Sequence, residues 1–253
     1  MKSQDAAPDP NFVVVTNALN GAISPFCVSG DIPFGNDRLT LHFSPDEDNA
    51  NLKAVRFPLV DSDAITPLIE ACKQARFGIG QQSVLDPEYR RALVLHGSQF
   101  AVAPATSLDP SVLGILADVR RALLGDPAAH IVARLDKLNV YGVGDFFKGH
   151  VDTPSSNRMF GTLLINLPVE HQGGNLVVYA PNNRGSGEEL EEGEQTDVGE
   201  APGHRNSFTT NWGDVNTLGW IAFFSDCPHE VLPVTQGNRC ESLITTVNAL
   251  KLT

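Results

Sequence analysis

The sequence lacks a long apolar run and a targeting segment. No stretch approaches the roughly 18 consecutive apolar residues that a membrane-spanning helix needs, so we expect no membrane partner. The opening MKSQDAAPDP has neither the basic start nor the apolar core of a secretory signal. These absences predict a cytoplasmic or nuclear protein.

Cysteines are few and widely spaced. The chain has four of them in 253 residues, and no two form a CxxC pair; they are Cys27, Cys72, Cys227 and Cys240. Zinc ribbons and disulfide frameworks need tighter, repeated spacing. We therefore expect reduced, partly buried thiols, although Cys227 and Cys240 would approach each other if their strands pair.

Basic residues are also scarce, because 18 Lys and Arg face 30 Asp and Glu, for a formal net charge of -12. Binding to a nucleic-acid backbone depends on clustered Lys and Arg. The charge therefore argues against nucleic acid as the main partner and leaves a protein, a peptide or a small molecule.

The length is compatible with a single domain. Residues 1–10 read as a disordered tail, and residues 11–253 as one domain. Within it, residues 11–129 supply short strands and supporting helices, whereas residues 130–253 are rich in strands.

Two segments of the first half have helical spacing of apolar residues. In residues 66–76 the apolar positions recur every three or four residues, and Pro67 suits the first turn. Residues 109–125 begin with an Asp cap followed by Pro110 and end at Gly125. We expect both helices to pack an apolar face on the core.

Strands dominate the rest of the chain. In the first half, the apolar segments FVVV, RLTLHF and AVRFPLV are separated by Gly, Pro, Asn and Asp. In the second half we predict strands over residues 133–141, 146–152, 159–167, 175–180, 220–225 and 242–250. This order predicts an α+β, mainly β fold, with a double-stranded β-helix (jelly-roll) core and supporting helices from the N-terminal half.

A polar segment, residues 181–211, interrupts these strands. It holds five glutamates between Glu188 and Glu194 and almost no large apolar residue. Loops of this length in a compact domain are usually lids, binding loops or disordered segments. We expect a mobile loop and leave open whether it is a lid or disordered.

The chemistry of the chain centres on three residues. His150 and Asp152 form its only HxD motif, and residues i and i+2 of a strand point to the same side. His229 follows a strong apolar strand and can supply a third ligand. Two histidines and one carboxylate with open positions are the donor set of non-haem Fe(II) oxygenases. The same three catalytic, metal-ligating residues would also suit a zinc hydrolase.

Arg239 favours the oxygenase. It lies ten residues beyond His229, at the start of the last strong strand. A guanidinium is always charged and matches a carboxylate with two parallel donors. Arg239 is therefore the candidate anchor for the distal carboxylate of a 2-oxo acid co-substrate.

Together these motifs resemble the prolyl 4-hydroxylase-like family of Fe(II)- and 2-oxoglutarate-dependent oxygenases. LNVYGVGDFFKGHVDT is similar to the first metal-binding segment of that family, WIAFFSDCPHEVLPVTQGNR to the second, and HQGGNLVVY to the turn and strand between them. The likeness spans about residues 130–250. It implies that residues 11–253 form one oxygenase domain that uses Fe(II), 2-oxoglutarate and O2, with ascorbate as a further candidate.

The resemblance also implies roles for other residues. Tyr141 matches a tyrosine that borders the co-substrate pocket, and Thr162 or Asn166 lies near the position of a second co-substrate partner. The chain departs from the Arg-x-Ser pattern of several relatives, because Glu241 stands two residues after Arg239. This departure leaves the second partner of the carboxylate open.

The implied reaction hydroxylates a C–H bond and releases succinate and CO2. The family likeness favours a prolyl residue of a protein or peptide as the substrate, with a small metabolite as the alternative. A zinc-dependent hydrolase and a non-catalytic jelly-roll binding module are the rival interpretations from other classes.

Overall fold

The computed structural model describes residues 25–34, 39–46, 50–79, 82–153, 156, 158–181 and 206–248. The expected tail and the FVVV strand lie outside these residues. The same holds for most of the expected loop over residues 181–211, including its glutamates.

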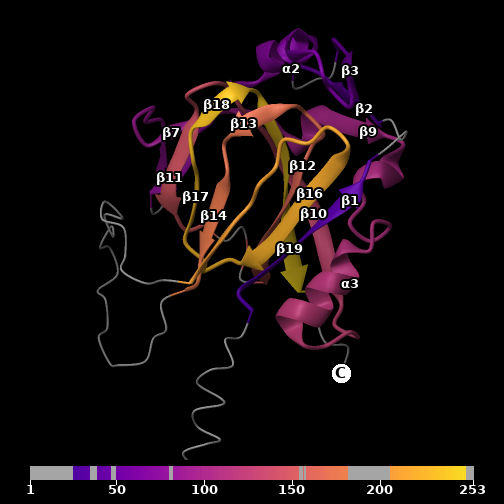
Figure 1. Ribbon diagram of the computed structural model, residues 1–253, viewed down its shortest axis with the longest axis vertical. Helices are drawn as coiled ribbons and strands as arrows, with labels where there is room; N and C mark the ends of the chain where they lie inside the picture. Colours follow the sequence, from indigo (N-terminus) through magenta and orange to yellow (C-terminus); the bar gives the residue numbers. More distant parts are fainter. Residues whose placement is uncertain are drawn as a thin grey trace, which may run out of the picture.

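Two sheets face each other and form the body of the molecule (Figure 1). In the described part of the chain, the larger sheet has the order β1 (Cys27–Pro33), β16 (Thr217–Phe224), β12 (Met159–Asn166), β19 (Arg239–Asn248), β10 (Ile131–Tyr141), β8 (Leu93–His96) and β4 (Lys73–Gln74). The smaller sheet has the order β15 (Ser207–Thr209), β14 (Leu176–Tyr179), β17 (His229–Val231), β11 (Phe146–His150) and β7 (Arg90–Arg91).

Eight strands follow the pairing order of a double-stranded β-helix; in chain order they are β10, β11, β12, β14, β15, β16, β17 and β19. In the larger sheet they lie in the order β10, β19, β12 and β16, and in the smaller sheet in the order β11, β17, β14 and β15. By their place in the chain these are the first, eighth, third and sixth strands, and the second, seventh, fourth and fifth. All of these pairs are antiparallel. The predicted jelly-roll core is thus confirmed, with β1, β8 and β4 added to the larger sheet and β7 to the smaller one.

The central strands are apolar on both faces because both faces are buried. On β12, Leu163 and Ile165 pack into the core outside the jelly roll, while Leu164 between them packs into the core between the sheets. Neighbouring β16 divides in the same way, with Trp220 outside and Phe223 inside. Such strands read as continuous apolar runs rather than as alternating patterns.

The remaining elements mostly come from the N-terminal half. They are the sheet of β3 (Lys53–Phe57), β2 (Leu39–Phe43) and β9 (Phe100–Ala103), the hairpins β5 (Phe77–Ile79)–β6 (Gln82–Val84) and β13 (His171–Gly173)–β18 (Val234–Gly237), the short helices η1 (Ser62–Ile65), η2 (Gly97–Gln99) and η3 (Ala105–Leu108), and α2 (Thr66–Ala71), α3 (Ile115–Val119) and η4 (Arg120–Leu124). In Figure 1, α2 lies beside β2 and β3 at one end of the molecule, and α3 lies at the other. Both helices bury side chains in the core outside the jelly roll, as predicted.

The two helices are shorter than the sequence predicts. α2 ends at Ala71, and the chain then enters β4, which pairs with the edge of the larger sheet. The second helix begins only at Ile115, because Gly114 has a left-handed backbone (φ 77°), and Asp109 and Pro110 lie in the preceding turn. Gly125 is also left-handed (φ 61°) and ends the helical segment, as predicted.

The predicted strands of the second half all form, with shifted ends. One correction concerns the segment over residues 181–211, where β15 pairs with β14 and extends the smaller sheet. No described helix is long and apolar enough to span a membrane.

The four thiols are free, with two buried and two half-buried, as predicted. Cys240 packs in the core outside the jelly roll, and Cys227 packs in the core between the sheets. The thiols of Cys227 and Cys240 therefore lie in different cores.

Gly219 provides a test of packing at the inner end of the jelly roll. A Cβ at this position would overlap the indole of Trp212, so we expect Gly219→Ala to lower the free energy of unfolding by about 1–3 kcal/mol. Urea denaturation followed by circular dichroism measures this loss. Gly142→Ala is the control, because its Cβ would meet neighbours at an ordinary 3.6 Å; equal stability of the two variants would contradict the expectation.

Candidate metal and co-substrate site

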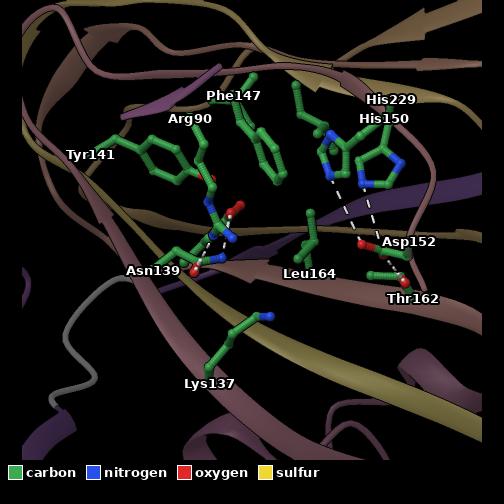
Figure 2. Close-up of a pocket in the computed structure, with 13 residues that line it drawn as sticks. Arg90, Lys137, Asn139, Tyr141, Phe147, His150, Asp152, Thr162, Leu164 and His229 are labelled. Atoms are coloured by element: carbon green, nitrogen blue, oxygen red, sulfur yellow. Dashed lines mark hydrogen bonds and ion pairs between the residues drawn. The ribbon is translucent and has the colours of Figure 1, made fainter. Parts of the chain in front are cut away.

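Three predicted residues meet between the two sheets. His150 ends β11 and lies directly opposite His229, the first residue of β17. Asp152 follows two residues after His150 and turns toward both rings (Figure 2). One potential ligand atom from each side chain lies within 4.8 Å of the others. The pairing of two strands therefore creates the cluster that the sequence predicts.

Backbone carbonyls orient both imidazoles. Nδ1 of His150 lies 2.9 Å from the oxygen of Lys148, and Nδ1 of His229 lies 3.0 Å from that of Cys227. A carbonyl can only accept a hydrogen bond, so each Nδ1 is the donor and each Nε2 carries the free lone pair. The two Nε2 atoms lie 3.9 and 3.8 Å from the carboxylate of Asp152. This tautomer and orientation are those that a metal-binding histidine requires.

Thr162 positions the carboxylate. Its hydroxyl donates to Asp152 across 2.6 Å from β12, so the second sheet fixes the third member of the cluster. Burial alone would raise the pKa of Asp152, but His229, His150 and this hydrogen bond together lower it. Burial, reinforced by His229, lowers the pKa of His150 well below its usual value. A neutral imidazole beside an ionised carboxylate is the protonation state that binds a metal.

An aromatic ring backs the cluster. Phe147 stacks on His150 with ring centroids 3.5 Å apart and an interplanar angle of 22°. The opposite strand β7 places the guanidinium of Arg90 4.4 Å from the centroid of Phe147. One ring thus contacts both a candidate metal ligand and a buried cation.

The cluster opens into a small cavity that is partly open to solvent. Apolar side chains of both sheets form part of its wall, among them Leu164, Leu176 and Val231. Its polar lining includes Arg90, Lys137, Asn139, Tyr141, Thr162 and Glu241 beside the three clustered residues (Figure 2). The cavity therefore joins the predicted metal cluster to a charged region on β7, β10 and β19.

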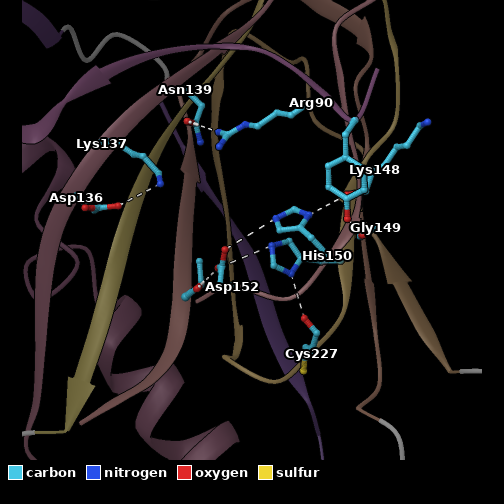
Figure 3. Close-up of polar contacts among 12 residues, drawn as sticks. Arg90, Asp136, Lys137, Asn139, Lys148, Gly149, His150, Asp152 and Cys227 are labelled. Atoms are coloured by element: carbon cyan, nitrogen blue, oxygen red, sulfur yellow. Dashed lines mark hydrogen bonds and ion pairs between the residues drawn. The ribbon is translucent and has the colours of Figure 1, made fainter. Parts of the chain in front are cut away.

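This charged region is a buried network. Arg239 contacts Glu241 at 2.5 Å, Asn139 donates to the other Glu241 oxygen at 3.3 Å, and Arg90 donates to Asn139 at 3.1 Å. Figure 3 shows the last of these contacts. Tyr141 lies beside the network, where burial and the charge of Glu241 raise its pKa to about 12, so its hydroxyl stays protonated.

The predicted co-substrate residues have different positions. Tyr141 and Thr162 line the cavity, although Thr162 directs its hydroxyl to Asp152. Asn166 is buried, donates to the oxygen of Leu167 and is not among the cavity-lining residues. Arg239 is fully buried and also outside the lining; Glu241, its ion-pair partner, lines the cavity instead.

Some lining residues were missed by sequence reasoning. Lys137 and Asn139 precede Tyr141 by four and two residues on β10, and alternation along a strand would have placed them on the same face. Glu241 lies two residues after Arg239 on β19, so the same alternation would have placed it on the face of Arg239. Arg90 comes from a two-residue strand with no motif, and only the fold brings it to the cavity.

The site fits the cofactors of non-haem oxygenases. Two imidazoles and one carboxylate are the typical donor set for Fe(II) with open positions. At the other end, Nε of Arg90 and both Nε and Nη1 of Arg239 are buried without a hydrogen-bond partner. Such unpaired cationic donors are suited to an incoming carboxylate.

Comparison with known families agrees with this chemistry. Residues 137–246 match the model of the 2OG-Fe(II) oxygenase superfamily, whose cofactors are Fe(II) and 2-oxoglutarate, with O2 as the oxidant. Over these residues the match agrees with the resemblance to Fe(II)- and 2-oxoglutarate-dependent oxygenases that the motifs indicate. No curated protein matches the chain.

Several solved structures are similar to this chain. A Pseudomonas putida prolyl-4-hydroxylase is 13% identical, with 88% of this chain and 93% of that chain covered and a TM-score of 0.45. A Trichoplax adhaerens prolyl hydroxylase in complex with a hypoxia inducible factor peptide fragment is 14% identical, with 94% and 88% covered and a TM-score of 0.43. The Escherichia coli ribosomal oxygenase YcfD, in complex with cobalt and 2-oxoglutarate, is 13% identical, with 94% and 52% covered and a TM-score of 0.31.

Thr162 allows a test of how the carboxylate is held. Thr162→Val removes the hydroxyl that orients Asp152 while keeping the side-chain shape, so we expect about tenfold weaker metal binding. Calorimetric titration with Mn(II) measures the affinity. Thr162→Ser keeps the hydroxyl and should bind as the wild type does; unchanged affinity in the valine variant would show that Asp152 needs no such support.

Proposed function

We propose that this protein is an Fe(II)- and 2-oxoglutarate-dependent dioxygenase that hydroxylates a C–H bond. The observation that carries the proposal is the convergence of His150, Asp152 and His229, each oriented by a hydrogen bond of its own. The superfamily match over residues 137–246 supports the same assignment.

In this proposal the three clustered residues hold the metal and leave adjacent positions open toward the cavity. Bound Fe(II), with 2-oxoglutarate and O2, supplies oxidative decarboxylation to succinate and CO2, coupled to hydroxylation of the substrate. The protein supplies geometry and shielding. Phe147 keeps the His150 ring in place, and Leu164, Leu176 and Val231 line the cavity with apolar surface.

The charged end of the cavity receives the distal carboxylate of 2-oxoglutarate. The two buried guanidiniums of Arg90 and Arg239 outnumber the single carboxylate of Glu241, and Lys137 adds a further cation to the lining. The hydroxyl of protonated Tyr141 borders the same region and is a further donor. The sequence-based assignment of Arg239 as the anchor remains a prediction, since Glu241 already pairs with it.

For the substrate we propose a prolyl residue of a protein or peptide. The support is the likeness of the two metal-binding segments to those of prolyl 4-hydroxylase-like enzymes.

Removal of a metal ligand tests the assignment of the site. Asp152→Ala and His229→Ala should abolish succinate formation from 2-oxoglutarate and leave the circular dichroism spectrum unchanged, because each removes one of three donors. His171→Ala is a matched control: His171 is as buried as His229, and its Nδ1 also contacts the carbonyl two residues earlier. Succinate release at the wild-type rate by either ligand variant would refute the assignment. A wild-type protein that holds Zn(II) and binds no 2-oxoglutarate would indicate a hydrolase instead.

A peptide array tests the substrate proposal. Proline-containing peptides incubated with Fe(II), 2-oxoglutarate and O2 should gain the mass of one oxygen atom on a prolyl residue, as mass spectrometry with fragmentation shows. The Asp152→Ala variant should give no such gain. Succinate formation stimulated by a small metabolite but by no prolyl peptide would reject the proposed substrate and retain the proposed reaction.

A further inference from the structure

The end of β11 that carries His150 contains a β-bulge. From Phe147 to His150 the strand advances three positions, while the paired positions on β17 advance only two. Lys148 and Gly149 together therefore oppose a single residue of β17, Glu230. The regular ladder is interrupted there, so the backbone groups that it releases need other partners. Whatever holds this bulge also affects where the ring of His150 points.

Tyr89 binds both residues of the bulge. Its carbonyl accepts a hydrogen bond from the backbone N–H of Lys148 at 3.0 Å, and its hydroxyl donates to the carbonyl of Gly149 at 2.6 Å. Any residue at position 89 could make the first contact, because it uses only the backbone. The second contact requires the phenol. The hydroxyl of Tyr89 is thus the part of this arrangement that the sequence specifies.

The peptide group between these two contacts orients His150. The carbonyl of Lys148 lies 2.9 Å from Nδ1 of His150, and Figure 3 shows Lys148, Gly149 and His150 together at the end of β11. Tyr89 holds the peptide group before this carbonyl, through the N–H of Lys148, and the one after it, through the oxygen of Gly149. The acceptor that fixes the imidazole is therefore itself fixed on both sides by one residue.

Two aromatic contacts keep the ring of Tyr89 in place. It stacks on Phe77 with centroids 4.7 Å apart and an interplanar angle of 29°, and it meets Phe147 edge-on at 6.1 Å and 78°. These contacts depend on the ring and not on the hydroxyl. Removal of the hydroxyl alone should therefore leave the packing of this region intact.

We propose that Tyr89 is a positioning residue for His150. Its hydroxyl holds the bulge so that the carbonyl of Lys148 accepts the Nδ1 proton of His150 and Nε2 faces Asp152 and His229. This inference rests on the proposed function, because it takes His150 as a metal ligand. It adds a residue that lies outside the residues matching the superfamily model.

The first test uses the metal-free protein and compares Tyr89→Phe with the wild type. Long-range 1H–15N NMR of the imidazole nitrogens, at a slightly alkaline pH where an ordinary histidine is neutral, shows which nitrogen carries the proton. In the wild type both His150 and His229 should carry it on Nδ1. In Tyr89→Phe we expect a second tautomer of His150 and an unchanged signal of His229, since a different carbonyl, that of Cys227, orients His229.

The second test measures metal affinity by calorimetric titration with Mn(II). Tyr89→Phe should bind Mn(II) about tenfold more weakly than the wild type, as expected when an outer partner of a ligand is removed. Tyr179→Phe is the matched control. It also removes a phenol hydroxyl, which donates to the side chain of Glu230 beside His229 and not to the backbone of a ligand-bearing bulge. This variant should bind Mn(II) as the wild type does.

The other outcomes overturn the inference. An unchanged His150 tautomer and equal Mn(II) affinities of the two phenylalanine variants would reject the role of Tyr89 and leave the proposed function standing. Equal changes in the signals of His150 and His229, with a lower urea midpoint, would give Tyr89 a structural role only. A wild-type protein that binds no Mn(II) would reject the metal site of the proposed function, and this inference with it.

Discussion

The register between β11 and β17 is the constraint on which the candidate site depends. It places His150 directly opposite His229, and a shift of one residue would turn one of the two rings to the other face of the sheet. Two features hold this register. The ladder continues on the far side of β17, where Val178 of β14 lies opposite His229, and the ring of Phe147 packs on that of His150. The larger sheet then adds Thr162, which fixes the carboxylate from the opposite wall. The site therefore needs both sheets at their observed separation.

The buried charges of Arg90, Arg239 and Glu241 are subject to a different constraint, which is their mutual pairing. Buried guanidiniums destabilise a fold unless each finds a partner, and Glu241 provides one for Arg239. The guanidinium of Arg239 also lies 5.3 and 5.4 Å from the ring centroids of Tyr141 and Trp212, and Asn139 connects Glu241 to Arg90. Glu241 stands where the Arg-x-Ser pattern has serine, and its carboxylate adds a negative charge beside Arg239. The departure noted in the sequence is thus a difference in charge and not only in size.

Much of the fold and of the metal cluster could be predicted from the sequence, because both depend on local patterns. Apolar runs mark the central strands, and a strand that carries His150 must place Asp152 near the same face. The helix ends were predicted less well: Gly114 interrupts the second helix, and tertiary pairing converts residues 73–74 from helix to strand. The position of Arg90 at the cavity has no local signal, since β7 is two residues long and only its pairing with β11 brings it there.

The position of β7 affects how the amino-acid sequence of such a protein can vary. All three candidate metal ligands belong to the jelly roll, whereas Arg90 arrives from the N-terminal half and attaches to the edge of the smaller sheet. Substitutions in the attached segment can therefore change the charge that lines the cavity without altering the three clustered side chains. In this architecture, the charged lining of the cavity and the cluster of potential metal ligands are encoded partly on separate stretches of polypeptide.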